Sequence, residues 1–256
     1  MREFSAFLNK ELLERFRKGR LWILGGVFFA MGVISPLMAW VTPILYDMLS
    51  EEFAQIGMTV GEIHVSAIDS WLQFVGNVPM AMLVTVILFS GAYTGEYSKG
   101  TLIPLVTKGL SRRVFVLAKL LAECIVWTGG LLLCFMVTYI GTALLWDNST
   151  VKHLLFACFG WWLYGVFFLC AAAAFSAFMK SMVQVLLCLG SLYIVIRILG
   201  FFPMCIKYLP TKLSSSATLY SGAEGPADFI PAILIAAVLS AVFVIIAVKV
   251  TDKRQL

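Results

Sequence analysis

Six long stretches of this 256-residue chain are almost entirely apolar. A bilayer core about 30 Å thick requires about 20 apolar residues of helix, and each stretch reaches that length. Because the hydrocarbon holds no water to satisfy backbone amides and carbonyls, each stretch must form a helix. The sequence therefore predicts six transmembrane helices, at about residues 21–40, 72–92, 114–145, 154–178, 183–202 and 229–248.

The composition agrees with an all-α integral membrane protein. Hydrophobic residues make up 61% of the chain and charged residues 13%, whereas soluble domains are about half apolar and about one quarter charged. The mean hydropathy is +0.95. The connections between the apolar stretches are too short to hold a further domain, so we expect residues 1–256 to form a single transmembrane domain.

Basic residues fall mostly on one side of the predicted spans. Fifteen of the 19 Lys and Arg residues lie in the first twenty residues, the second–third connection, the fourth–fifth turn and the C-terminal tail. The first connection, about Val41 to Ser70, carries five acidic residues and no basic one, and we expect it to be mainly a solvated loop with room for one or two short helices. The positive-inside bias predicts that both termini are cytoplasmic. The net charge of +5 is then a topology signal, and we expect no nucleic-acid partner.

The first 20 residues predict an amphipathic helix on the membrane surface. Apolar residues recur on one helical face, at Phe4, Phe7, Leu8, Leu12 and Phe16. Such a helix would place this face in the lipid boundary and its cations toward acidic headgroups. It is either a simple lipid anchor or a brace that carries movement from a cytoplasmic partner into the first span.

The connection between the second and third spans is short and rich in turn-forming residues. Thr101 can cap a helix that Gly109 ends, and Ser111 can cap the third span. Between them, Leu102, Leu105 and Val106 share one face and form a small apolar knob flanked by Lys99 and Lys108. We interpret Leu102 to Lys108 as a short helix that docks on a soluble protein. The alternative is a solvated basic loop.

These residues resemble a motif of the permease subunits of type-2 ATP-binding cassette (ABC-2) exporters. In that motif an acidic residue and a Gly-Thr pair precede a short coupling helix, and a Ser-Arg turn and a Lys follow it. The corresponding residues are Glu96, Gly100, Thr101, the helix Leu102 to Lys108 with Leu105 and Val106, and then Ser111, Arg112, Arg113 and Lys119. One departure is Lys108-Gly109-Leu110, where members often have Pro-Val or Pro-Ile.

The resemblance implies a permease subunit that docks through these residues on a separate ATP-binding cassette ATPase. It further implies two ATPase copies, a second permease that makes a homodimer, ATP and Mg on the ATPase, and the plasma membrane of a prokaryote. The sequence contains no GxxxxGK[ST] phosphate loop, so we expect no enzyme activity and no cofactor on this chain itself.

Two ionisable residues lie within predicted spans, where they are functional candidates by default. Glu123 is four residues after Lys119, which favours an i,i+4 ion pair near the inner interface. Arg197 is about six residues from the outer end of the fifth span. It either extends to the interface or faces an anionic substrate group in the translocation path.

The apolar spans favour an amphipathic or hydrophobic cargo such as a peptide, an antimicrobial or a drug. Alternatives are an ATPase-associated subunit that signals or confers immunity without transport, and an ion or lipid exporter. A membrane-embedded enzyme would require paired Glu, Asp or His residues within spans, but apart from Glu123 these residues fall at or beyond the ends of the predicted spans. The six cysteines show no metal-ligand spacing. We therefore expect neither a catalytic nor a metal site.

Overall fold

The computed structural model of this chain describes residues 2–55, 64–98, 104, 107 and 111–253. Within these residues the secondary structure is helical, with no strand, and six helices are long and apolar enough to cross a membrane. They are α2 (Arg20–Gln55), α3 (Ala67–Ser98), α5 (Arg112–Leu145), α6 (Leu154–Phe178), α7 (Met182–Leu199) and α10 (Ile230–Lys253). The prediction of an all-helical protein with six candidate spans is confirmed.

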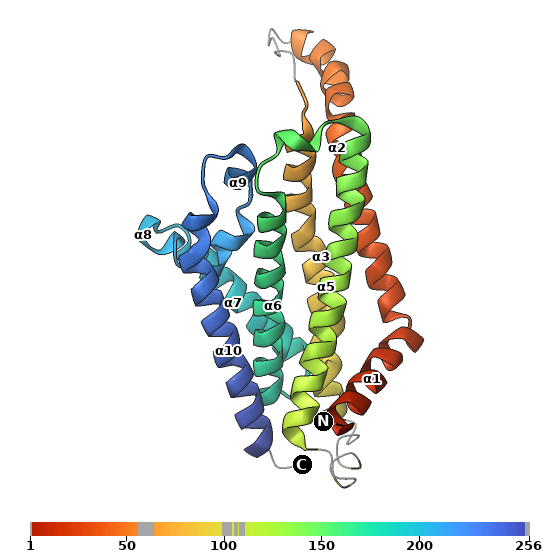
Figure 1. The fold of residues 1–256 in the computed structure, drawn as a ribbon, viewed down its shortest axis with the longest axis vertical. Coiled ribbons are helices and arrows are strands. Elements are labelled where there is room, and N and C mark those ends of the chain that lie inside the picture. Colours follow the sequence, from red (N-terminus) through yellow and green to blue (C-terminus); the bar gives the residue numbers. More distant parts are fainter. Residues whose placement is uncertain (1, 56–63, 99–103, 105–106, 108–110, 254–256) are drawn as a thin grey trace.

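The six long helices form an elongated bundle with different features at its two ends (Figure 1). One end, which we name the terminal end, contains α1 (Arg2–Arg17), the C-terminal ends of α3 and α10, and the start of α5. The opposite end contains the short helices α8 (Pro203–Ile206) and α9 (Ala217–Ser221) and the 3-10 turns η1 (Asn148–Thr150), η2 (Pro210–Ser214) and η3 (Pro226–Phe229). The first and last described residues, Arg2 and Lys253, therefore lie at the same end.

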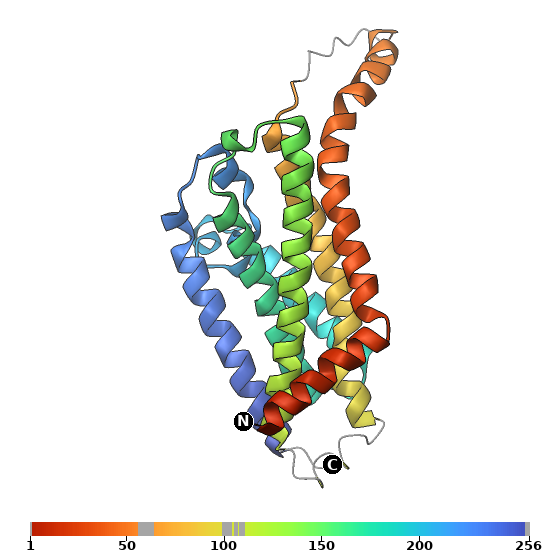
Figure 2. The same cartoon turned by 45° about the vertical axis from the view of Figure 1, so that its right-hand side comes forward.

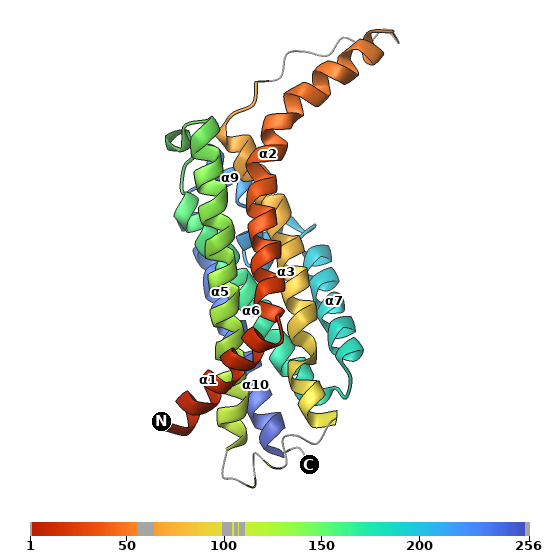
Figure 3. The ribbon, with the colours of Figure 1, turned by 90° about the vertical axis from the view of Figure 1, so that its right-hand side faces the viewer.

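Helix α2 is longer than the sequence predicts. We expected the first span to end near Trp40 and a loop to follow, but the helix continues to Gln55 and contains Pro36 and Pro43. Its 36 residues correspond to about 54 Å at 1.5 Å per residue, well beyond a bilayer core of about 30 Å. Figure 3 shows the far part of α2 extending away from the bundle. Hydropathy reports the length of apolar sequence, and a helix can continue past that length.

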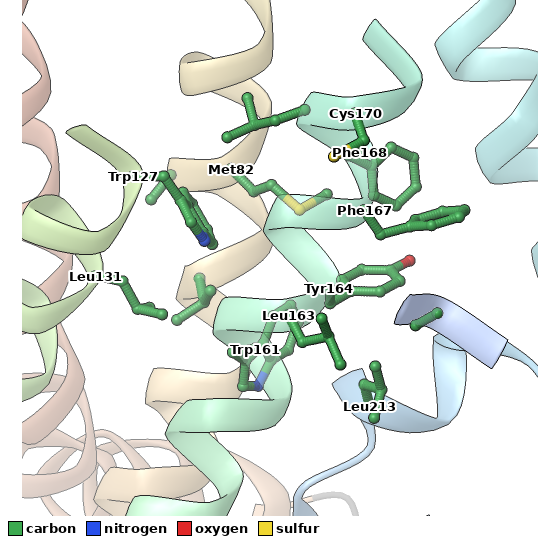
Figure 4. Packing of buried hydrophobic residues seen from close by; sticks show 14 of the residues in the cluster. Met82, Trp127, Leu131, Trp161, Leu163, Tyr164, Phe167, Phe168, Cys170 and Leu213 are labelled. Carbon is green, nitrogen blue, oxygen red and sulfur yellow. The ribbon is translucent and has the colours of Figure 1, made fainter. Parts of the chain in front are cut away.

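Helix α6 forms the centre of the bundle, and more of it is buried than of the other five spans. Trp161, Tyr164 and Phe167 are each 1% exposed, and Figure 4 shows these side chains pointing in different directions from the helix. Gly165 lies against the Trp127 ring of α5, so that a Cβ at this position would overlap the indole. The indole Nε1 of Trp127 donates to the Trp162 carbonyl at 3.1 Å. Because other helices surround most of α6, its sequence shows no amphipathic periodicity.

Small side chains allow close contact in two helix pairs. Helix α6 packs on α10, and both contribute buried alanines to the core. These are Ala171, Ala172, Ala173 and Ala174 of α6 and Ala232, Ala236 and Ala247 of α10. Helix α2 packs on α5, where a Cβ at Gly32 would lie 2.9 Å from the Cys134 carbonyl oxygen. Close packing of this kind is the main source of helix association within a membrane.

The segment between α7 and α10 folds back over the core and is held by one ion pair. The Lys212 ammonium is bonded to both carboxylate oxygens of Glu224, at 2.5 and 2.6 Å, and lies 4.8 Å from the Phe229 ring centroid. The hydrogen bond from Lys212 lowers the pKa of Glu224. Nearby, the Tyr220 and Trp71 rings pack at 6.1 Å. This segment therefore closes the end of the bundle opposite the termini.

Candidate functional site

Helix α1 lies across the terminal end and packs against the bundle (Figure 2). Gly19, with φ of +73°, makes the turn between α1 and α2, a backbone conformation that favours glycine. Phe7 is 6% exposed and its ring lies 5.9 Å from that of Phe115 on α5. Phe16, at the other end of the predicted apolar face, is 52% exposed. Part of that face therefore contacts protein, and the interfacial position of α1 in a membrane stays a prediction.

The face of α1 that contacts the bundle also carries charge. Glu11 and Arg15 follow Phe7 at intervals of four residues, and both are buried. The ammonium of Lys119 on α5 lies 3.1 Å from a Glu11 carboxylate oxygen and 2.7 Å from a Glu96 carboxylate oxygen. Glu96 is in the last turn of α3. A single lysine thus joins α1, α3 and α5.

A second set of contacts lies beside the first. Arg15 Nη2 is 3.4 Å from a carboxylate oxygen of Glu123, and its guanidinium lies 4.5 Å from the Phe89 ring centroid. The Tyr93 hydroxyl donates to the other Glu123 oxygen at 3.5 Å. Arg15 also lies 3.9 Å from Glu11, which connects the two sets. We name Glu11, Arg15, Glu96, Lys119 and Glu123 together the ion network.

Because the ion network is buried, each of its charged side chains requires its partner. The side chains of Glu11, Lys119, Arg15 and Glu123 are 1–5% exposed, and that of Glu96 is 16% exposed. Removing one partner from a buried pair leaves an uncompensated charge and costs about 3–5 kcal/mol. The three carboxylates and two cations therefore hold α1, α3 and α5 in one arrangement. This arrangement lies beside the two helix ends that residues 99–110 connect.

The exposed face of α1 carries ion pairs of a different kind. Glu14 lies 3.1 Å from Lys10 and 2.5 Å from Lys18, both one turn away. The hydrogen bond from Lys18 is the main cause that lowers the Glu14 pKa to about 2. Because these side chains are 35–57% exposed, their pairs stabilise the helix only slightly. This face leaves α1 charged on the side away from the bundle.

The start of α5 is tied to the end of α10. Arg112 Nη1 donates to the carbonyls of Thr251 and Asp252 at 3.3 and 3.1 Å. Arg113 Nε donates to the Asp252 carboxylate at 2.7 Å, and the Arg113 side chain is 71% exposed. A cation at the C-terminal end of α10 is favoured by the helix dipole. The terminal end of the bundle is thus connected through α1, α3, α5 and α10.

The sequence profile of the ABC-2 family transporter proteins matches residues 6–219 of this chain. The chain belongs to the ABC-2 transporter family. The matched range begins within α1 and ends within α9, so it contains all five residues of the ion network. No curated protein sequence is similar enough to the chain to add to this comparison.

Membership of the ABC-2 family identifies the chain as the membrane component of an ABC transporter and supports partnership with an ABC ATPase subunit. Of the predicted docking residues, Glu96, Arg112 and Arg113 are described, and each contacts another helix of the chain. The other six, Gly100, Thr101, Leu102, Leu105, Val106 and Lys108, lie outside the described residues, as do Lys99 and Gly109. The coupling helix therefore stays a prediction. Within this connection Thr107 is described, and its hydroxyl donates to the Pro104 carbonyl at 3.1 Å.

Two predictions about the start of α5 have different outcomes. Ser111 caps α5 as predicted, because its hydroxyl accepts from the Val114 amide at 3.2 Å. The predicted pairing of Lys119 with Glu123 is wrong: Lys119 pairs with Glu11 and Glu96, and Glu123 pairs with Arg15. The spacing on α5 cannot show a partner on another helix. A signal for the true partners exists in α1, where two charged residues share the helical face of Phe7.

Arg197 lies on α7, away from the ion network. Its Nε donates to the Tyr193 hydroxyl one turn earlier, at 3.1 Å. The guanidinium carbon is 5.3 Å from the centroid of the same ring. The structure therefore places Arg197 on a surface distinct from the terminal end of this ABC-2 protein.

Proposed function

We propose that the chain is the permease subunit of an ATP-driven exporter and moves an amphipathic or hydrophobic substrate, such as a peptide, an antimicrobial or a drug, out of the cytoplasm. A separate ATPase subunit supplies the energy. ABC-2 family membership supports a transporter membrane subunit; the direction, the substrate class and the assembly belong to this proposal. Two ATPases and two copies of this chain make the working unit, and ATP and Mg bind to the ATPases.

The observation that carries the proposal is the ion network at the terminal end. Residues 99–110 connect Ser98 of α3 to α5, and the network joins these same two helices through Lys119 and Glu96. A force applied to this connection therefore reaches α1 through the pair of Lys119 and Glu11. A buried ion network of this kind resists separation of its helices, so we expect α1, the end of α3 and the start of α5 to move together.

The charge distribution supports a cytoplasmic terminal end. Twelve of the 19 Lys and Arg residues are described residues that lie at this end or in the turn between α6 and α7, and the positive-inside bias places such residues in the cytoplasm. An ATPase that docks here meets the connection at residues 99–110 together with the exposed, charged face of α1. The plasma membrane of a prokaryote is the proposed location.

A single substitution in the predicted knob tests this proposal. Leu105→Asp introduces a carboxylate where apolar contact with the ATPase is expected, and we expect it to release the ATPase from the purified complex and to abolish substrate-stimulated ATP hydrolysis. The matched control is Ala223→Asp, because Ala223 is exposed at the opposite end of the bundle, away from the proposed docking surface. Both variants are checked for intact folding by size-exclusion chromatography and circular dichroism.

Three results would count against the proposal. If no ATPase copurifies, or if Leu105→Asp binds and turns over like the parent chain, residues 99–110 are only a connection between spans. If ATP hydrolysis occurs in reconstituted vesicles without any movement of substrate, the chain is instead an ATPase-associated signalling or immunity subunit.

A further inference from the structure

An apolar cavity of about 430 Å³ lies between α3, α6 and α7, outside the terminal end. Its volume falls in the range of about 300–1,000 Å³ that ligand pockets occupy. The lining residues are almost all apolar and include Met80, Leu83, Ile87, Phe168, Leu189 and Tyr193. Met80 and Leu83 are 61% and 55% exposed, so this cavity faces the side of the bundle that lipid surrounds. Figure 3 shows α7 lying beside α3 at the edge of the bundle.

Polar groups gather beside one end of this cavity. Tyr193 is both a lining residue and the acceptor of the hydrogen bond from Arg197. Among the described residues no carboxylate lies within ion-pair distance of Arg197. Arg197 is exposed in the last turn of α7, so its guanidinium is accessible to an anionic group at this end of the cavity.

A second, independent observation points to the same place. The Tyr164 hydroxyl on α6 is buried and has no hydrogen-bond partner among the described residues. The Tyr164 ring packs on Phe168 of the cavity wall at 5.1 Å, and the Phe168 ring packs on Tyr193 at 6.2 Å. Figure 4 shows Tyr164 and Phe168 on the same side of α6. A buried donor without a partner is costly, so a ligand acceptor at this position would relieve that cost.

We propose that this cavity binds a single-chain anionic amphiphile, with its apolar chain between α3 and α7 and its anionic group at Arg197. This inference rests on the proposed function and narrows its substrate class. The cavity wall on α7 runs from Leu186 to Tyr193, about 10 Å at 1.5 Å per residue, and Arg197 is one turn further. A chain lying along α7 therefore brings a carboxylate or phosphate to the guanidinium, which binds such groups through paired hydrogen bonds.

Photolabelling of the full chain tests the site without the ATPase. The chain is reconstituted in nanodiscs of phosphatidylcholine and labelled with a diazirine-bearing undecanoate, and the labelled peptides are identified by mass spectrometry. We expect label on α3 and α7, displaced by dodecanoate and at least about tenfold less well by dodecanol, because the alcohol lacks the charge that Arg197 binds. Equal competition by the alcohol, or label only on other helices, would overturn the proposal.

Two pairs of variants separate the charge from the cavity. Arg197→Gln should weaken labelling about tenfold, whereas Arg197→Lys keeps the charge and should retain more of it. Gly190→Leu should also block labelling, because Gly190 lines the cavity and a Cβ there meets no atom within 4 Å. The matched control is Gly129→Leu on α5, where a Cβ is equally unobstructed. Labelling that is indifferent to both Arg197→Gln and Gly190→Leu would refute the site.

ATP hydrolysis by the complex of the chain with its ATPase tests whether the bound amphiphile is a substrate. Dodecanoate should stimulate ATP hydrolysis by the complex, and Gly190→Leu should remove that stimulation while leaving ATPase binding intact. If dodecanoate labels the cavity but stimulates no hydrolysis, the substrate assignment is wrong. The proposed function is tested separately, by copurification of an ATPase, by the effect of Leu105→Asp and by movement of substrate in vesicles, so the two failures are distinguishable.

Discussion

Lys119→Met removes the ammonium that joins three helices at the terminal end of the bundle. The carboxylates of Glu11 and Glu96 would be left 4% and 16% exposed, with little access to water. Removal of one partner from a buried pair costs about 3–5 kcal/mol. Because Glu96 is the more exposed of the two carboxylates, we expect a loss near the lower limit, about 3 kcal/mol of unfolding free energy. Lys10→Met is the matched control: Lys10 also pairs with Glu11 but is 45% exposed, so its loss should stay within about 1 kcal/mol.

The assay is unfolding of the purified chain in mixed micelles, followed by circular dichroism and by fluorescence of its seven tryptophans. A second substitution, Glu11→Gln, removes one of the carboxylates that Lys119→Met leaves unpaired. The double variant should therefore be less destabilised than the sum of the single variants, by about 0.5–3 kcal/mol. If Lys119→Met unfolds within about 1 kcal/mol of the parent, or if the two losses simply add, the ion network does not hold the helices as described.

Two further predictions concern the core and the opposite end. Gly165→Leu should destabilise the bundle strongly or prevent its folding, because the new side chain overlaps the Trp127 ring, whereas Gly129→Leu should unfold like the parent in the same micelle assay. The pKa of Glu224 lies below its ordinary value of 4.5 because Lys212 donates to its carboxylate. The stabilisation by the ionised Glu224 is therefore fully present above about pH 4.5, and it is lost as the pH falls through the lower pKa that Glu224 has in the folded state. The difference in melting temperature between the parent and Glu224→Gln should shrink in that acidic window, and a pH-independent difference would contradict this account.

The number and order of the spans could be predicted from the sequence because apolar length is a direct consequence of bilayer thickness. The cap at Ser111 could also be predicted from the sequence, because a capping hydroxyl accepts from an amide three residues later in the same chain. The length of α2 was not, because nothing in hydropathy requires a helix to end where apolar sequence ends.

Partners on other helices are the part that sequence patterns do not contain. Glu96, Arg112 and Arg113 were interpreted as docking residues, yet the structure uses each of them in contacts between helices. Lys119 and Glu123 are well placed for an i,i+4 pair, but buried partners from α1 and α3 compete for both. The choice depends on how α1 packs on the bundle, which the spacing along one helix cannot specify.

The most direct test of the central claim is hydrogen–deuterium exchange of the chain alone and of its complex with the ATPase held in an ATP-bound state. The account predicts slower exchange in the complex for α1 and for residues 94–119, with no change in residues 210–229 at the opposite end. Slower exchange confined to residues 210–229, or no difference at the terminal end, would contradict the claim that an ATPase drives this transporter subunit through its terminal end.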